Sequence, residues 1–401
     1  MPIKKTKVTK HMNFIDLFSG IGGFHTALNR MGHKCVLACD IDKKCREIYK
    51  KNYGIEPVND IREINEKTMP NFDILCAGFP CQSFSNAGKK QAFEDKVRGT
   101  LFFDIIRIAK EKQPKFMFLE NVKHIKKVDE GNVFNTILGA LDEIGYYIED
   151  EKSVFELSPH YLGIPQDRKR IIFVCIRKDI YNPDKVIDLG LEENVTINFD
   201  NIIEKEVDPK YKVKSNIVYL FDTWDKMVRQ MEPGQKMSPT ILCNEFNSNY
   251  SEEEFENLPQ WKQDYITKNK PIYQKYKQLW DSWYEEHKDI LKKKEVNGKL
   301  EWQAGPLKEN DSIWNHFIQL RQSGIRVKKS KFFPTLVAIV QTPIYGKEKR
   351  YITPRECARL QSFPDSFILP ESDNVAYKQF GNAVNVEVVY RVMSKTLELY
   401  K

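Results

Sequence analysis

The residue with the clearest chemical potential is Cys81, which follows an apolar run at 71–77 that is typical of a buried strand. Pro80 restricts the backbone before it, and the segment 83–99 after it contains glycines and several lysines. A partly exposed, electropositive setting lowers the pKa of a thiol and so favours the nucleophilic thiolate. Cys81 is therefore the predicted nucleophile, whereas most of the eight cysteines are expected to be inert apolar residues.

Three charged side chains stand at the ends of two further predicted strands. Glu120 ends the apolar run at 116–119, where a carboxylate is costly unless it is paired or used. Arg168 and Arg170 alternate at the start of a strand at 170–176, so their guanidinium groups point to the same side of an extended chain. They are predicted to hold an acidic group or the carbonyl of a base. A solvent-exposed glutamate and an arginine pair on an edge strand remain alternatives.

A glycine-rich turn at 18–23 lies between a predicted strand and a predicted helix, and it lets a ligand approach the backbone closely. It departs from the dinucleotide fingerprint because His25 stands where that pattern has its third glycine. Asp40 ends the next predicted strand, where its carboxylate can accept hydrogen bonds from both hydroxyls of a ribose. Ile41 beside it offers an apolar face to an adenine. These residues predict a nucleoside site, although such turns and strand-end aspartates also occur for structural reasons.

The elements that must position these side chains alternate between strand and helix. Strands are predicted at 13–18, 34–39, 71–77, 115–120 and 170–176, and helices at 23–31, 43–52, 100–112, 133–144 and 383–400. Such alternation implies right-handed crossovers and a parallel sheet in an α/β fold. Ligands of these sheets lie at the carboxyl ends of the strands, which is where Cys81, Glu120, Asp40 and the glycine-rich turn are expected.

The composition limits the remaining possibilities. With 401 residues, two domains are expected. No apolar run approaches the roughly 20 residues that cross a bilayer, and the basic N-terminus is not typical of a secretory signal, so a cytoplasmic protein without a membrane partner is expected. The cysteines and histidines lack the spacing of a zinc site, so no metal is expected. A basic cluster at 326–331 and 347–350 is compatible with phosphate contacts or simply with a solvated surface.

The composition changes near residue 183, after which Lys, Trp, Tyr, Asn and Glu are frequent and regular periodicity is lost. We therefore predict a catalytic and cofactor-binding domain at 1–182, a smaller, irregular domain at 183–349, and a C-terminal segment at 350–401 that completes the first domain with a helix. The stretch 261–294 is predicted to contain long polar helices, and 252–294 is predicted to be an insert without a role in reading bases.

Taken together and in this order, the motifs resemble those of the bacterial DNA (cytosine-5) methyltransferases. The matching segments are 14–23, 78–82, 98–103, 120–122, 166–170, 355–364 and 379–384, together with Asp40 and the pair Asp60 and Ile61. The combination of Pro-Cys-Gln, Glu-Asn-Val and Gln-x-Arg-x-Arg is far more specific than any one motif. The resemblance covers 1–180 and 350–401, and the middle of the chain corresponds only in position to the family's variable target-recognition domain.

The resemblance implies a role for each matching residue. Cys81 is similar to the family's nucleophile, Glu120 to the acid that engages N3 of cytosine, and Arg168 and Arg170 to the pair that steadies the base and this acid. The implied cofactor shell comprises Phe18, Ser19, Gly20, Ile21, Gly22, Gly23, Asp40, Ile41, Asp60, Ile61, Gly78, Pro80, Leu101, Asn382 and Val384. Implied DNA contacts are Gln82, Ser85, Asn86, Lys89, Arg98 and Thr335, with Thr240 as a competitor for the role of Thr335.

The resemblance further implies a Rossmann-like methyltransferase fold that uses S-adenosylmethionine to methylate carbon 5 of a flipped-out cytosine in double-stranded DNA. A monomeric modification enzyme that shares its target site with a restriction endonuclease is expected. A tRNA methyltransferase of the same family is the alternative, and the long middle segment argues against it. A catalytically silent DNA-binding relative is disfavoured because Cys81, Glu120 and both arginines are present. An NAD-dependent oxidoreductase is disfavoured by the missing third glycine.

Overall fold

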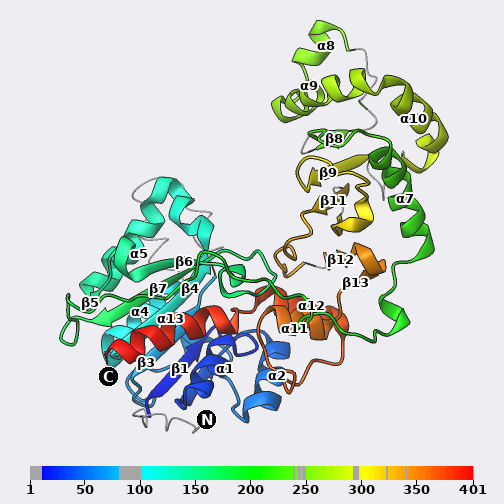
Figure 1. The fold of residues 1–401 in the computed structure, drawn as a ribbon. Helices are drawn as coiled ribbons and strands as arrows, with labels where there is room; N and C mark the ends of the chain where they lie inside the picture. Colours follow the sequence, from blue (N-terminus) through cyan, green and yellow to red (C-terminus); the bar gives the residue numbers. More distant parts are fainter. Residues whose placement is uncertain are drawn as a thin grey trace. The chain divides into compact units, whose positions relative to one another are not determined.

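The computed structural model describes residues 11–80, 101–237, 240–242, 245, 250–291, 298–321, 324–339 and 341–400. Its contacts divide the chain into two units: unit 1 comprises Met1–Ile203 and Pro354–Lys401, and unit 2 comprises Glu204–Thr353 (Figure 1). The first boundary lies later than the predicted residue 183, because Leu189 and Ile202 are buried and Arg391 donates to the carbonyl oxygens of Leu189 and Gly190 at 3.0 and 3.1 Å. The second boundary lies close to the predicted residue 350.

Unit 1 is built on a seven-stranded sheet with the order β2-β1-β3-β4-β7-β5, in which β6 also pairs with β7. The strands are β1 (Asn13–Leu17), β2 (Lys34–Cys39), β3 (Ile74–Gly78), β4 (Phe116–Val122), β5 (Tyr146–Tyr147), β6 (Val154–Leu157) and β7 (Arg170–Arg177). The first four strands are parallel, whereas β7 is antiparallel to β4, β5 and β6. The expected parallel sheet is therefore a mixed one, because the chain passes from β6 to β7 without the crossover helix that a parallel pair needs.

The helices of unit 1 are α1 (Gly23–Arg30), α2 (Lys43–Tyr53), α4 (Leu101–Lys112), α5 (Asn132–Glu143), α6 (Asp150–Ser153), α11 (Pro354–Leu360), α12 (Asp373–Asn382) and α13 (Val386–Leu399). In the described part of this unit they are accompanied by the 3-10 segments η1 (Ile61–Glu63), η2 (Lys123–Gly131) and η3 (Pro159–Leu162). Buried side chains of α4 and α5 pack against alternate residues of β3 and β4, among them Leu75, Ala77, Met117 and Leu119. The C-terminal helix α13, red in Figure 1, packs against α1 and so completes the unit, as predicted.

Unit 2 contains a six-stranded sheet with the order β13-β12-β10-β11-β9-β8, where an irregular domain was expected. Its strands are β8 (Ile241–Leu242), β9 (Lys299–Gln303), β10 (Phe317–Arg321), β11 (Gly324–Lys328), β12 (Ile344–Tyr345) and β13 (Arg350–Tyr351). Its helical segments are η4 (Pro209–Tyr211), α7 (Ser215–Arg229), α8 (Glu252–Glu256), α9 (Gln260–Lys275), α10 (Lys277–Leu291), η6 (Ile313–Asn315) and η7 (Gly346–Glu348). Each of these strands has at most five residues, and charged side chains alternate with apolar ones along them. Such short segments repeat the two-residue strand pattern too few times to stand out in the sequence.

Helix α10, within the predicted insert 252–294, belongs to the core of unit 2. Trp280, Trp283 and Leu291 of α10 are buried in one hydrophobic cluster with Trp224 of α7 and Trp302 of β9. The Nε1–H of Trp283 also donates to the carbonyl oxygen of Thr223 at 2.5 Å. Because burial of such large side chains is a major source of stability, α10 is an integral part of the unit rather than an appendage.

Candidate active site

Two parallel strands end beside each other at the carboxyl edge of the unit 1 sheet. Gly78 ends β3 and is in register with Glu120 of β4, and a Cβ built on Gly78 would lie 3.6 Å from Oε2 of that glutamate. Phe79 then buries its ring against those of Phe102 and Phe173. Pro80, which is exposed, is the last described residue before position 101. The predicted site residues Cys81, Gln82, Ser85, Asn86, Lys89 and Arg98 lie outside the described residues.

Asn121 fixes the backbone that leads to Cys81. Its buried side chain donates from Nδ2 to the carbonyl oxygen of Phe79 at 3.0 Å and accepts through Oδ1 from the N–H of Val122 at 2.8 Å. The first bond ties the end of β4 to the turn after β3. Sequence reasoning placed Asn121 in a motif without giving it a role, although an asparagine inside an apolar strand is unusual enough to be a signal.

Glu120 is the carboxylate of this site. Its Oε1 lies 3.1 Å from Nε of Arg170, the first residue of β7, and the two side chains are only 12% and 18% exposed. Burial raises the pKa of Glu120 above its ordinary value, while the positive charges of Arg170 and Arg168 oppose this effect. The sequence left open which effect dominates; in the structure burial does, and the protonated acid is favoured compared with an exposed glutamate.

Arg168 has a different partner from Arg170. It is buried, and its Nη2 donates to the carbonyl oxygens of Gly381 and Ala383 at 3.0 and 2.9 Å. Burial lowers the pKa of Arg168 to about 9, with the charge of Arg170 adding to this effect and that of Glu120 opposing it. Arg170 therefore meets the acid directly, whereas Arg168 anchors the C-terminal segment and acts on Glu120 through its charge.

Two further polar residues near the arginines were not assigned a role from the sequence. Oγ of Ser158 accepts a hydrogen bond from the backbone N–H of Arg168 at 2.9 Å. Gln166 is completely buried, and its side-chain amide makes no hydrogen bond in the described part of the chain. Because a buried amide without partners is costly, Gln166 is a candidate for contact with a bound substrate. Its place at the start of the Gln-x-Arg-x-Arg motif was the available signal.

The glycines of the turn after β1 differ in what they face. Gly20 has a φ of +54° and open space around its Cβ position. A Cβ on Gly22 would instead overlap the ring of Tyr53, and one on Gly23 would lie 2.5 Å from the carbonyl oxygen of Val384. Gly20 therefore leaves the open space that the expected close approach of a ligand requires, whereas Gly22 and Gly23 make room for Tyr53 and Val384.

Tyr53 supports this turn from α2. Its hydroxyl lies 3.1 and 3.0 Å from the carbonyl oxygens of Ile21 and Gly22 and 2.7 Å from Oγ1 of Thr26. Its ring stacks on the buried His25, with 3.9 Å between the ring centroids. The histidine that replaces the third glycine of the dinucleotide pattern therefore packs beneath the turn.

Asp40 joins the turn after β1 to the turn after β2. Its carboxylate accepts the N–H of Gly20 at 2.7 Å and that of Asp42 at 2.8 Å. Nη1 of Arg46 donates to the carbonyl oxygens of both Asp40 and Ile41, each at 2.9 Å. Ile41 is 69% exposed and so presents apolar surface at the carboxyl edge of the sheet. Asp40 thus has a structural task in addition to the ribose contact that we expected.

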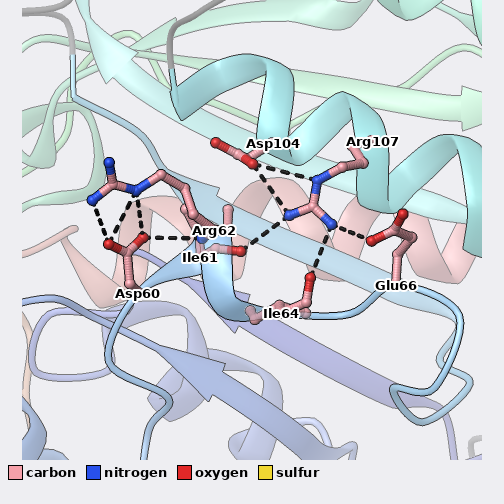
Figure 2. Close-up of polar contacts among 7 residues, drawn as sticks. All are labelled: Asp60, Ile61, Arg62, Ile64, Glu66, Asp104 and Arg107. Atoms are coloured by element: carbon pink, nitrogen blue, oxygen red, sulfur yellow. Dashed lines mark hydrogen bonds and ion pairs between the residues drawn. The ribbon is translucent and has the colours of Figure 1, made fainter.

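Asp60 and Ile61 stand at the start of η1 (Figure 2). The carboxylate of Asp60 accepts the backbone N–H of Arg62 at 3.0 Å and pairs with the guanidinium group of Arg62 at 2.5 to 3.0 Å. These bonds lower the pKa of Asp60. Arg46 also donates to Oδ1 of Asn59 at 2.8 Å, so it links the segment that carries Asp60 with the one that carries Ile41.

The other residues predicted for the cofactor shell also belong to unit 1. They are Phe18, whose φ of 53° is rare for a non-glycine residue, the buried Ser19 and Ile21, Leu101 at the start of α4, and the exposed Asn382 at the end of α12. Thr335 belongs to unit 2, between β11 and β12. Among the described residues, no group of three or more His, Cys, Asp or Glu side chains is arranged to hold a metal ion. No helix in the described ranges has the length and apolar character to cross a membrane.

Comparison with known proteins gives the same family as the motifs. The family model described as C-5 cytosine-specific DNA methylase matches residues 12–398. Type II methyltransferase M1.ScrFI of Lactococcus lactis subsp. cremoris is 35% identical over 99% of this chain and 81% of its own length. Type II methyltransferase M.HhaI of Haemophilus parahaemolyticus is 31% identical over 96% of this chain and 94% of its own length.

A solved structure of a mutant of Spodoptera frugiperda DNMT2 has a TM-score of 0.54 at 19% identity and covers 98% of this chain and 100% of its own. At that identity the similarity concerns the fold, and it agrees with the predicted methyltransferase sheet. The family model and the two bacterial relatives extend over nearly the whole chain. The chain therefore belongs to the C-5 cytosine-specific DNA methylase family and is a DNA (cytosine-5) methyltransferase.

Proposed function

We propose that this enzyme takes its methyl group from S-adenosylmethionine and works through a covalent adduct between Cys81 and the target cytosine. Carbon 5 of cytosine is a poor nucleophile in an aromatic ring. When the Cys81 thiolate adds to carbon 6, a sulfur–carbon bond forms and the double bond between carbons 5 and 6 opens, which makes the ring an enamine. Carbon 5 can then take an electrophilic methyl group, whose bond to the sulfonium sulfur breaks and leaves its electron pair on that sulfur. A base then removes the carbon 5 proton, the sulfur–carbon bond breaks, and the thiolate leaves with its electron pair as the ring is restored.

The single observation that carries this proposal is the place of Glu120. It lies in β4, two residues before the last residue of that strand, in register with Gly78, which ends the strand that leads to Cys81. N3 and carbon 6 lie across the cytosine ring from each other, so an acid and a thiolate from neighbouring strands can engage one base from two sides. Because burial raises the pKa of Glu120, this side chain is better able to hold the proton that N3 takes up when the thiolate adds. Arg170, at 3.1 Å, orients this carboxyl group.

The carboxyl edge around Gly20, Ile41 and Asp60 fits the nucleoside part of S-adenosylmethionine, which supplies a methyl group activated on a sulfonium ion. Gly20 leaves open space at its Cβ position, and Ile41 offers exposed apolar surface. Ile61 is the first residue of η1, where an N–H has no partner within the helix. Adenine carries a ring-nitrogen acceptor beside an amino donor, and this pattern matches the N–H of Ile61 beside the carboxylate of Asp60.

The DNA must present its cytosine outside the base stack, because carbon 6 of a stacked base is shielded from a thiolate; this rotation costs a few kcal/mol. We propose that the segment 83–99, with Lys89 and Arg98, closes over the flipped base and that Gln82, Ser85 or Asn86 fills the space left in the duplex. Unit 2 is the proposed target-recognition domain, with Thr335 among its DNA contacts. We also propose a cytoplasmic, monomeric modification enzyme that protects sites cut by a restriction endonuclease; the names of the bacterial relatives, which are Type II methyltransferases, support the modification role.

Transfer of labelled methyl groups to duplex DNA and to tRNA tests this function against the tRNA alternative. We expect label in duplex DNA, released as 5-methylcytosine after digestion. Bisulfite sequencing of plasmid from cells that express the protein should then show protected cytosines in one sequence context. Label that appears only in tRNA, or in a base other than cytosine, would refute the proposal.

A further inference from the structure

One arginine joins the turn at Asp60 to helix α4 (Figure 2). Nη1 of Arg107 donates to the carbonyl oxygen of Ile64 at 2.9 Å and also pairs with the carboxylate of Glu66. Nη2 donates to the carbonyl oxygen of Ile61 and to Oδ1 of Asp104, both at 3.1 Å. The guanidinium group therefore binds two backbone carbonyls of the turn and two carboxylates at once.

The turn depends on contacts from outside because it contains little structure of its own. η1 has only three residues, and short 3-10 segments have few internal hydrogen bonds. The side chains of Ile61 and Ile64 are buried, which sets the side of the turn that faces the core. On its carbonyl side, Arg107 supplies a donor to Ile64, which caps the end of η1, and a second donor to Ile61, whose carbonyl oxygen already accepts the N–H of Ile64 at 3.2 Å.

Arginine is the residue type that this arrangement requires. The two carbonyl groups are three positions apart in the chain and are reached by different nitrogens of one rigid, planar fork. Glu66 and Asp104, whose side chains are 24% and 21% exposed, hold this fork from two sides and balance its charge. A lysine ammonium group at this position is a single point charge and cannot occupy both places.

We propose that Arg107 is a positioning residue for cofactor binding. It places the carboxylate of Asp60 and the N–H of Ile61 toward the adenine without touching the cofactor itself. This inference rests on the proposed function, which gives the turn its ligand. Arg107 also sits on the helix that begins at Leu101, directly after the segment 81–100 in the chain, so one side chain connects the cofactor turn with the element that follows the nucleophile.

Calorimetric titration of S-adenosylmethionine into variants of the full chain, without DNA, tests the proposal. Arg107→Met should weaken cofactor binding about tenfold, which corresponds to about 1.4 kcal/mol. Arg107→Lys should show a smaller loss of cofactor affinity, because lysine keeps the positive charge and can keep one of the two carbonyl contacts. With saturating cofactor, kcat should stay within about twofold of wild type, so that the defect appears as a raised KM for the cofactor.

Lys110→Met is the matched control, because it removes a positive charge from an exposed position on the same helix. It should leave cofactor affinity and kcat unchanged. Equal cofactor affinity in wild type and Arg107→Met would overturn the proposal. A parallel loss of cofactor binding, DNA binding and kcat would indicate a general folding defect of this variant, and the decision would then rest on Glu66→Gln.

Glu66→Gln provides a second variant in case Arg107→Met does not fold, because it loosens the hold on Arg107 and leaves the arginine in place. We expect a rise of about two- to threefold in the cofactor Kd, as for the loss of one moderately strong ionic contact. An unchanged Kd would count against the positioning role. If the wild-type enzyme itself fails to bind S-adenosylmethionine, both the proposed function and this inference fail. If wild type binds and all variants bind equally, only the inference fails.

Discussion

Replacing Gly23 with alanine tests whether the protein itself demands a glycine at the start of α1. A Cβ at this position would lie 2.5 Å from the carbonyl oxygen of Val384 and 3.1 Å from its Cβ. Both distances are shorter than the roughly 3.5 Å at which non-bonded carbon atoms make favourable contact. The nearest atom belongs to the backbone, so it cannot move aside by a simple rotamer change. Either the segment at Val384 or the first turn of α1 must shift.

The size of the effect follows from two opposing contributions. Forcing an extra methyl group into a packed site costs roughly 1–3 kcal/mol. Alanine in place of glycine in a helix returns at most about 1 kcal/mol. We therefore expect Gly23→Ala to lower the free energy of unfolding of unit 1 by up to about 2 kcal/mol. Because Cγ2 of Val384 also lies 3.3 Å from the Cβ position of Gly78, a shift there should disturb the end of β3 and reduce methyl transfer.

Gly139→Ala is the matched control for this substitution. Gly139 lies within α5 and has no heavy atom within 4 Å of its Cβ position. The same change should therefore stabilise the protein by roughly 0.5–1 kcal/mol. Thermal and urea unfolding, followed by circular dichroism, should shift in opposite directions for the two variants. A Gly23→Ala protein at least as stable as wild type would falsify the packing argument, as would a loss of stability in Gly139→Ala.

Three further predictions concern buried polar groups of unit 1. Asn121→Ala leaves the carbonyl oxygen of Phe79 without its donor, so we expect a loss of about 1–3 kcal/mol in urea unfolding and slower methyl transfer; wild-type values for both would contradict the role of this amide. Arg170→Met removes the nearest positive charge from Glu120, so the pKa of Glu120 should rise and the alkaline limb of the kcat profile should move to higher pH, whereas a move to lower pH would oppose our assignment of the acid. Burial raises the pKa of Asp16 well above its ordinary range, so the folded state holds this proton more tightly than the unfolded chain does. The free energy of unfolding should therefore fall as the pH rises above the pKa of the unfolded chain, by up to about 1.4 kcal/mol per pH unit, and Asp16→Asn should remove this slope in urea titrations at several pH values.

Local patterns predicted most of the unit 1 elements well. The strand predicted at 34–39 is Lys34–Cys39, and the helix predicted at 43–52 is Lys43–Tyr53. Both could be predicted because the pattern of apolar residues that marks each element is contained in its own residues. The strands β5 and β6 were not predicted, since two to four residues carry too little pattern. The antiparallel direction of β7 was also missed, because it depends on the connection from β6 rather than on the residues of the strand.

The site also divides into features that a local pattern predicts and contacts between distant parts of the chain that it does not. Glu120 and Arg170 could be predicted because a charge at the end of an apolar strand is a local signal, and the structure brings the two together. The bonds from Arg168 to Gly381 and Ala383 join residues more than 200 positions apart, and no local pattern reveals them. The packing of Tyr53 on Gly22 is likewise a contact between separate elements. Sequence reasoning therefore assigned the glycines to the ligand alone, whereas part of their task is to accommodate neighbouring residues.

The central claim is a bond between Sγ of Cys81 and carbon 6 of the target base, and trapping on duplex DNA with 5-fluorocytosine at the methylated position tests it most directly. Fluorine at carbon 5 cannot be removed as a proton is, so the adduct cannot break down after methyl transfer. We predict a protein–DNA complex that survives denaturing electrophoresis, requires S-adenosylmethionine and is absent with Cys81→Ser. A complex that persists with Cys81→Ser, or no complex from an enzyme that methylates ordinary cytosine in the same duplex, would contradict the covalent mechanism.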